Sequence, residues 1–140
     1  MKVIVAEDNR IDSSVMLSTL NKLNLNAISV ASGLEAWKVL LAHPTFDLLI
    51  TDYMMPDMNG ADLVCSVRNH KILHEMPILI VSGFVKLSEV KKILDLGASR
   101  FQAKPIKTSE FVENICALLD LDKVVFDEDG SDQISSIHSF

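Results

Sequence analysis

Charged and hydroxyl side chains follow short apolar segments at several points of this 140-residue chain. Lysine and hydroxyl groups can bind a phosphoryl group, whereas clustered carboxylates repel one another unless a cation neutralises them. Mg²⁺ accepts carboxylate oxygens at a partly open site and also binds a phosphate oxygen. The residues concerned are Glu7 and Asp8 after VIVA, Asp52 after LLIT, Ser82 at the end of ILIVS with Gly83 next, and Lys104 and Pro105 after RFQA. Together they would suit a site for a divalent cation and a phosphoryl group.

The apolar segments that precede these residues are predicted to be β-strands. Those in Val3–Ala6, Leu48–Thr51 and Ile78–Ser82 are nearly continuous in Val, Ile and Leu, as in strands covered on both faces. Ala27–Val30 and Arg100–Ala103 complete a set of five. Segments of helical length and spacing lie between them. Strand and helix alternating in this way predict a parallel sheet with helices on both faces.

Helix-capping residues support this alternation. Ser32 with Glu35 three positions later forms the pattern of a capping box before the second helix. Gly97 stands where the fourth helix should end, and Thr108 is a candidate cap for the fifth. We therefore expect one α/β domain over residues 1–120, a (βα)5 three-layer sandwich. Residues 121–140 are acidic and lack sustained periodicity, so we expect a flexible C-terminal tail.

The carboxyl ends of parallel strands meet at one edge of a sheet, and ligands bind beyond that edge. Each residue taken alone has a structural explanation: the acids could cap helices or form turns, and Lys104 could be a solvated charge. Their coincidence at one edge favours the functional interpretation.

Several functions are disfavoured by composition. The net charge of −6 offers no basic surface for direct nucleic-acid binding. No apolar run approaches the ~20 residues that span a bilayer, and the N-terminus lacks a signal-peptide pattern, so we expect a cytoplasmic protein without membrane contact. Cys65 and Cys116 lack metal-ligand spacing and are expected to be reduced thiols. His70 and His74 are interpreted as a solvated pair.

The chain resembles the receiver domain of two-component response regulators, a flavodoxin-like fold of the chemotaxis (CheY-like) type with strand order 2-1-3-4-5. The resemblance covers Lys2 to Leu119. It rests on four motifs in the order and at the spacing of the family, namely EDN (Glu7–Asn9), DYMMPDMNG (Asp52–Gly60), SG (Ser82–Gly83) and FQAKP (Phe101–Pro105).

By this resemblance, Asp52 would be the phosphoacceptor and would take a phosphoryl group from a phosphohistidine. Asp8 would bind Mg²⁺ (or Mn²⁺) directly, Glu7 directly or through water, and the Met54 backbone carbonyl would complete the protein ligands together with Asp52. Lys104 would pair with phosphoryl oxygens, and its peptide bond to Pro105 would be cis.

The resemblance also assigns switch and tuning positions. Ser82, followed by Gly83, and Phe101 would move on phosphorylation, although the family often has Thr and Tyr there and Phe101 lacks the tyrosine hydroxyl. The fourth helix, fifth strand and fifth helix would then change shape. Met54 and Phe84 would flank the phosphoryl group; both are apolar, and we hypothesise that they slow hydrolysis of the aspartyl phosphate.

The expected function is therefore signalling, and not catalysis beyond the chain's own phosphorylation and dephosphorylation. Its partners would be a sensor histidine kinase or a histidine phosphotransfer protein, and an unidentified downstream protein. A stand-alone regulator is the first expectation; a fragment of a larger regulator or hybrid kinase, or a non-phosphorylated pseudo-receiver, are the alternatives. A dehalogenase-type phosphatase is disfavoured because it needs an aspartate where Met54 stands. Regulators of the winged-helix type usually carry acids at the positions of Ser99 and Arg100, where they form part of a symmetric dimer interface. We therefore do not expect that dimer here.

Overall fold

The computed structural model describes residues 1–83, 86–125 and 135–137, so Phe84 lies outside the described residues. Strands and helices alternate from the N-terminus through the fifth helix, as predicted. The elements are β1 (Lys2–Ala6), α1 (Arg10–Lys22), β2 (Asn26–Val30), α2 (Gly33–Ala42), β3 (Leu48–Thr51), α3 (Gly60–Arg68), β4 (Ile78–Ser82), α4 (Leu87–Leu96), β5 (Arg100–Ala103), α5 (Thr108–Leu119), β6 (Lys123–Val125) and β7 (Ser135–Ile137).

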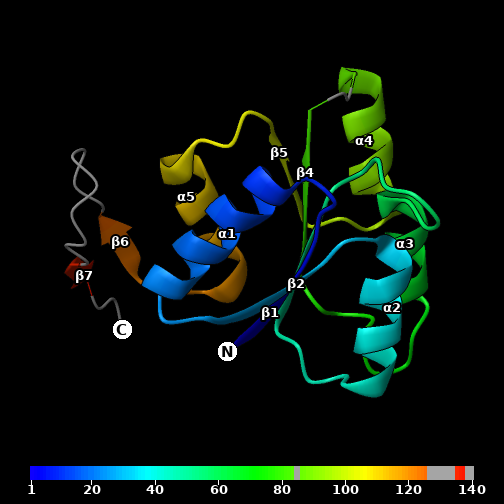
Figure 1. Cartoon of the computed structure of the whole chain (residues 1–140), viewed down its shortest axis with the longest axis horizontal. Coiled ribbons are helices and arrows are strands. Elements are labelled where there is room, and N and C mark those ends of the chain that lie inside the picture. The colour runs from blue at the N-terminus through cyan, green and yellow to red at the C-terminus, as the bar shows by residue number, and fades with distance from the viewer. Residues whose placement is uncertain (84–85, 126–134, 138–140) are drawn as a thin grey trace.

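The first five strands form one parallel sheet in the order β2-β1-β3-β4-β5, which confirms the predicted fold class. Figure 1 shows the sheet between two layers of helices, with α1 and α5 on one face and α2, α3 and α4 on the other. The register aligns the carboxyl ends, since Ala6 pairs with both Val30 and Thr51. The residues that follow β1 and β3 are therefore neighbours.

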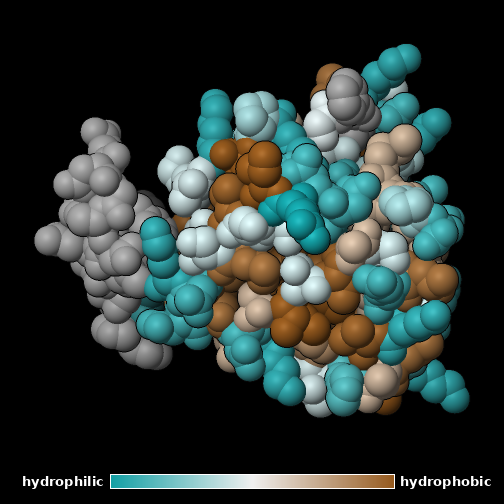
Figure 2. All heavy atoms as spheres, in the orientation of Figure 1, coloured by the Kyte–Doolittle hydropathy of each residue, from teal (hydrophilic) through white to brown (hydrophobic). Residues whose placement is uncertain are grey.

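Alternate side chains of the buried strands enter two separate cores. Ile4, Leu49 and Ile80 pack on the α2–α3–α4 side, and Val5, Ile50 and Val81 pack on the α1–α5 side. Continuous apolar strands are what a sheet covered on both faces requires. β2 is an edge strand with exposed positions, and Figure 2 shows hydrophobic side chains gathered between α1 and α2 around this edge.

Two of the three predicted caps are confirmed. Ser32 Oγ accepts a hydrogen bond from the Glu35 N–H at 3.1 Å, and Gly97 ends α4 with φ at 121°. The Glu35 carboxylate accepts from the Ala31 N–H at 3.0 Å, one residue before the position that a capping box uses. The cap predicted at Thr108 is wrong, because Thr108 is the first helical residue and α5 begins without a side-chain cap.

The segment after α5 contains regular structure that we did not predict. β6 pairs with β7 in an antiparallel two-stranded sheet that is separate from the main sheet (Figure 1). Residues 126–134 and 138–140, which belong to the predicted flexible tail, lie outside the described residues. The boundary of the domain at residue 120 stays a prediction. Across the described ranges, no helix has the length and apolar character to cross a membrane.

Candidate functional site

The three predicted acids meet at the carboxyl edge of the sheet. Glu7 and Asp52 follow adjacent strands, and the Asp52 N–H donates to the Ala6 carbonyl at 3.0 Å. One carboxylate oxygen of each of Glu7, Asp8 and Asp52 lies within 4.8 Å of the others. Asp52 and Glu7 are buried at 8% and 3% exposure, whereas Asp8 is exposed. The cluster therefore has a buried side and an open side.

Lys104 supplies the positive charge at this edge. Its backbone N–H donates to the Ser82 carbonyl at 3.0 Å, which continues the β4–β5 pairing and directs the side chain along the edge. Lys104 Nζ lies 2.9 Å from Asp52 Oδ2 and 2.5 Å from Glu7 Oε1. The peptide bond between Lys104 and Pro105 is cis. The Lys104 ammonium group thus contacts two of the three carboxylates directly.

A fourth acid, which the sequence did not suggest, also contacts this lysine. Asp12 Oδ2 lies 3.0 Å from Lys104 Nζ. The Asp12 N–H donates to Asn9 Oδ1 at 3.0 Å, so Asn9 caps α1 and holds Asp12 in its first turn. The only signal in the sequence was an asparagine three positions before an aspartate, which is a common helix start.

Burial and charge oppose one another in the cluster. Desolvation by burial raises the pKa of Glu7 to about 7, with contact to Lys104 opposing this rise and the charge of Asp52 adding to it. Burial alone would lower the pKa of Lys104, but its contacts with Glu7, Asp52 and Asp12 raise that pKa above its usual value. A single ammonium group faces several carboxylates, so the cluster is incompletely neutralised.

The donor atoms of the cluster fit a hard divalent cation. Glu7 Oε1 is buried beside Lys104 Nζ, yet it accepts no hydrogen bond of good geometry from the described residues. Asp52 Oδ1 accepts a long bond of 3.3 Å from the Met54 N–H. Oxygen ligands with unused lone pairs on an open site are the donor set of Mg²⁺. Glu7, Asp8 and Asp52 are the residues that could hold such an ion.

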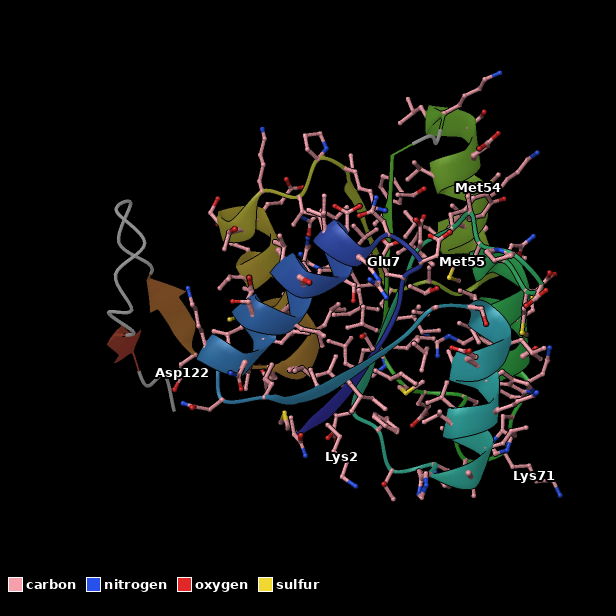
Figure 3. All side chains as sticks on the ribbon, in the orientation of Figure 1. Lys2, Glu7, Met54, Met55, Lys71 and Asp122 are labelled. Atoms are coloured by element: carbon pink, nitrogen blue, oxygen red, sulfur yellow. The ribbon has the colours of Figure 1, made fainter. Side chains whose placement is uncertain are left out.

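The remaining predicted residues surround this cluster. Ser82 is buried at the end of β4, Gly83 is exposed, and Phe101 is half-buried in β5 against the α2–α3–α4 core. Met54, in the loop after β3, is 61% exposed. Figure 3 shows Glu7, Met54 and Met55 toward one end of the sheet, while Lys2 lies at the other end of β1.

The loop after β3 returns close to Asp52 at Gly60. A Cβ atom on Gly60 would lie 2.7 Å from the Asp52 carbonyl oxygen and 2.9 Å from Tyr53 Cα. The Gly60 N–H also donates to the Tyr53 carbonyl at 2.9 Å. Because both obstructing atoms belong to the backbone, only glycine lets α3 begin this close to the site.

We expect Gly60→Ala to lower the free energy of unfolding by about 2 kcal/mol, because the methyl group forces the backbone at Asp52 to shift. Urea denaturation measures this change. Gly83→Ala is the matched control, since a Cβ there lies 3.6 Å from Lys104 Cβ, an ordinary contact, and a change within ~0.5 kcal/mol is expected. Equal stability of the two variants would contradict the close approach at Gly60.

His70 and His74 both make contacts within their own segment of the chain. His70 Nδ1 accepts hydrogen bonds from the Ile72 and Leu73 N–H groups at 3.1 and 3.3 Å, and its ring lies edge-on to Trp37 at 5.9 Å. His74 Nδ1 lies 2.9 Å from the Lys71 carbonyl. Within the described ranges, the only group of three or more metal-ligating side chains is Glu7, Asp8 and Asp52.

The fold and the acidic edge define a receiver domain. Residues 3–116 match the family model of the response regulator receiver domain. The chain therefore belongs to that family, whose members are signalling proteins of two-component systems. Chemotaxis protein CheY1 of Helicobacter pylori is 32% identical over 120 residues, covering 85% of this chain and 97% of that protein.

Solved structures share the fold. A putative response regulator from Chloroflexus aurantiacus superposes with a TM-score of 0.80 at 24% identity, covering 85% of this chain and 97% of that one. The receiver domain of a sensor histidine kinase from Pseudomonas aeruginosa PAO1, described with a magnesium ion coordinated in its active-site cleft, gives a TM-score of 0.77 at 20% identity, covering 85% and 97%.

Proposed function

We propose that this chain is a phosphoacceptor that takes a phosphoryl group from a phosphohistidine onto Asp52. The observation that carries the proposal is the contact of Lys104 Nζ with Asp52 Oδ2 at 2.9 Å, beside a group of three carboxylates within 4.8 Å. A lone surface aspartate would not need a partly buried lysine and two further acids around it. The membership of the chain in the receiver family supports the same function.

Transfer of the phosphoryl group needs a nucleophile and a positively charged group that stabilises the phosphoryl oxygens. An Asp52 carboxylate oxygen attacks phosphorus, the new P–O bond forms, the P–N bond to histidine breaks, and the histidine leaves with the bonding electron pair. Lys104 donates to the phosphoryl oxygens, and the Ser82 hydroxyl is the second donor at the end of β4. Catalysis of this kind is mainly positioning and charge stabilisation.

Mg²⁺ or Mn²⁺ is the proposed cofactor. Glu7, Asp8, Asp52 and the Met54 backbone carbonyl would hold it. A bound divalent ion would neutralise charge on the acceptor and phosphoryl oxygens during transfer. The buried Glu7 Oε1 without a well-oriented donor supports this assignment.

The proposed partners are a sensor histidine kinase or a histidine phosphotransfer protein, and a downstream protein that contacts the α4–β5–α5 face. Phe101 lies in β5 of this face, and Ser82 ends the neighbouring strand. Exposed apolar side chains on α4, Leu87 at 87% and Leu94 at 42%, give that face a surface for protein contact. Phosphorylation would change its shape through Ser82 and Phe101.

The test is incubation of the protein with acetyl phosphate, followed by intact-mass measurement. With Mg²⁺ we expect a fraction of the protein to gain the mass of one phosphoryl group, and with EDTA in place of Mg²⁺ we expect no adduct. Circular dichroism establishes that the protein is folded in both samples. A folded protein that takes no adduct with Mg²⁺ would overturn the proposal and favour a pseudo-receiver.

Met54 is expected to slow loss of the phosphoryl group. Its apolar side chain, 61% exposed beside Asp52, hinders the water that attacks phosphorus. In Met54→Asn we expect loss about fivefold faster, which corresponds to ~1 kcal/mol in the barrier. The decay of the adduct after removal of acetyl phosphate measures this rate. Met54→Leu keeps the apolar bulk and should decay like wild type; an unchanged rate in Met54→Asn would refute the role. Phe84→Glu tests the same hypothesis at the second apolar position, and it should also lose the phosphoryl group faster than wild type.

A further inference from the structure

The ammonium group of Lys104 contacts three carboxylates at once. Its Nζ atom lies 2.5 Å from Glu7, 2.9 Å from Asp52 and 3.0 Å from Asp12. An ammonium group has three N–H donors and no acceptor. Three carboxylates therefore surround the ammonium group in this structure, with Asp52 accepting a hydrogen bond and Glu7 and Asp12 forming ion pairs. A further oxygen can approach Lys104 Nζ closely only when one of the three acids moves aside.

Asp12 is the partner that can leave at the lowest cost. Its side chain is 25% exposed, whereas those of Glu7 and Asp52 are 0% and 10% exposed. A carboxylate that turns toward water is solvated, whereas a buried one left unpaired is strongly destabilised. Asp12 also lies in the first turn of a helix, outside the sheet that fixes the other two.

We infer that Asp12 is a positioning residue that occupies the space beside Lys104 Nζ needed by the phosphoryl group, and that it thereby opposes phosphorylation. This inference rests on the proposed phosphorylation of Asp52. The Asp12 carboxylate contacts Lys104 as a phosphoryl oxygen would. When the phosphoryl group arrives, Lys104 must release Asp12 before it can donate to the new oxygen. The unphosphorylated protein is stabilised relative to the phosphorylated one.

The charge of Asp12 acts in the same direction as this competition. A carboxylate that close to Lys104 faces the doubly charged phosphoryl group and repels it. Removal of the charge should therefore favour the phosphorylated state. A residue with only a structural role would have the opposite effect, because its loss would loosen the site and weaken binding.

The second Asn-x-x-Asp helix start of the chain provides a matched control. Asn59 caps α3 and accepts from the Asp62 N–H at 2.8 Å, as Asn9 does for Asp12. Asp62 is exposed and is not an ion-pair partner of Lys104. Asp62→Asn therefore removes the same charge from the same position of a helix without changing the donors of Lys104.

The experiment is a titration of the full chain with beryllofluoride, a tetrahedral mimic of the phosphoryl group, at saturating Mg²⁺. Backbone amide NMR shifts report binding. We expect Asp12→Asn to bind about fivefold more tightly than wild type, the scale of one part-buried ion pair. Asp12→Glu, which keeps the charge, and Asp62→Asn should bind like wild type. A parallel titration with Mg²⁺ alone fixes the concentration that saturates each variant.

The outcomes separate this inference from the proposed function. Equal or weaker binding by Asp12→Asn, with binding by wild type intact, overturns the role of Asp12 and leaves phosphorylation standing. Equal tightening in Asp12→Asn and Asp62→Asn also overturns it, because the effect would then be one of net charge. If wild type neither binds beryllofluoride nor takes a phosphoryl group from acetyl phosphate, the proposed function fails and the role of Asp12 fails with it.

Discussion

In the Asp52→Asn variant we expect no phosphoryl adduct after incubation with acetyl phosphate and Mg²⁺, under conditions where wild type is labelled. The amide is nearly the same size as the carboxylate, so the carbonyl oxygen can still accept from the Met54 N–H. It carries no negative charge and is a poor nucleophile. The loss should therefore be complete within detection, without a change in fold.

A neighbouring aspartate controls for the loss of charge. Asp57 lies in the same loop, is exposed, and has a left-handed φ of 68° that asparagine also tolerates. Asp57→Asn should be labelled like wild type. An adduct on Asp52→Asn would place the acceptor on another residue, and peptide mapping of the adduct would identify it, with Asp8 as the first residue to inspect.

We expect Lys104→Met to lower the free energy of unfolding in EDTA by about 3 kcal/mol. Removal of one member of a buried charged group leaves the others unpaired, which is more costly than the loss of a surface ion pair. Lys104 is 16% exposed, and it contacts three acids of which Glu7 is fully buried at its side chain. Urea denaturation with EDTA present gives the value.

Mg²⁺ should restore part of this stability. With the ammonium gone, the carboxylates attract a divalent ion more strongly, so the gain in stability on adding Mg²⁺ should be larger in Lys104→Met than in wild type. Lys107→Met, an exposed lysine three residues along the chain, should change stability by less than ~0.5 kcal/mol. If Mg²⁺ does not relieve the destabilisation, the variant loses its stability at some place other than this site.

Most of the fold follows from local sequence. The bounds predicted for β3 and β4 match the structure, because strands covered on both faces are nearly continuous in Val, Ile and Leu. The edge strand β2 and the short β5 have weaker patterns, and their places followed from the alternation of elements. The cap at Thr108 was wrong because a capping residue type does not decide which residue is the first in helical conformation. β6 and β7 had no periodicity that could predict them.

The sequence predicted that Glu7, Asp8, Asp52 and Lys104 would lie close together, but it did not predict Asp12 or the contacts within the cluster. Topology alone brings Glu7, Asp52 and Lys104 to one edge, since each follows a strand of the parallel sheet. The contact of Asp12 with Lys104 depends on the direction of α1 and on lysine side-chain conformation, which a pattern of residue types does not encode. The buried oxygen of Glu7 likewise depends on packing around the site.

The order of these residues along the chain bears on how the site is assembled. Glu7 and Asp52 are brought together by β1 and β3, yet the lysine that neutralises them lies 52 residues after Asp52. Until β5 pairs with β4, a paired β1 and β3 hold these two acids together without the lysine that neutralises them. Frustration of this kind is relieved only by long-range pairing. The acidic edge is therefore expected to be the last part of the sheet to become ordered during folding.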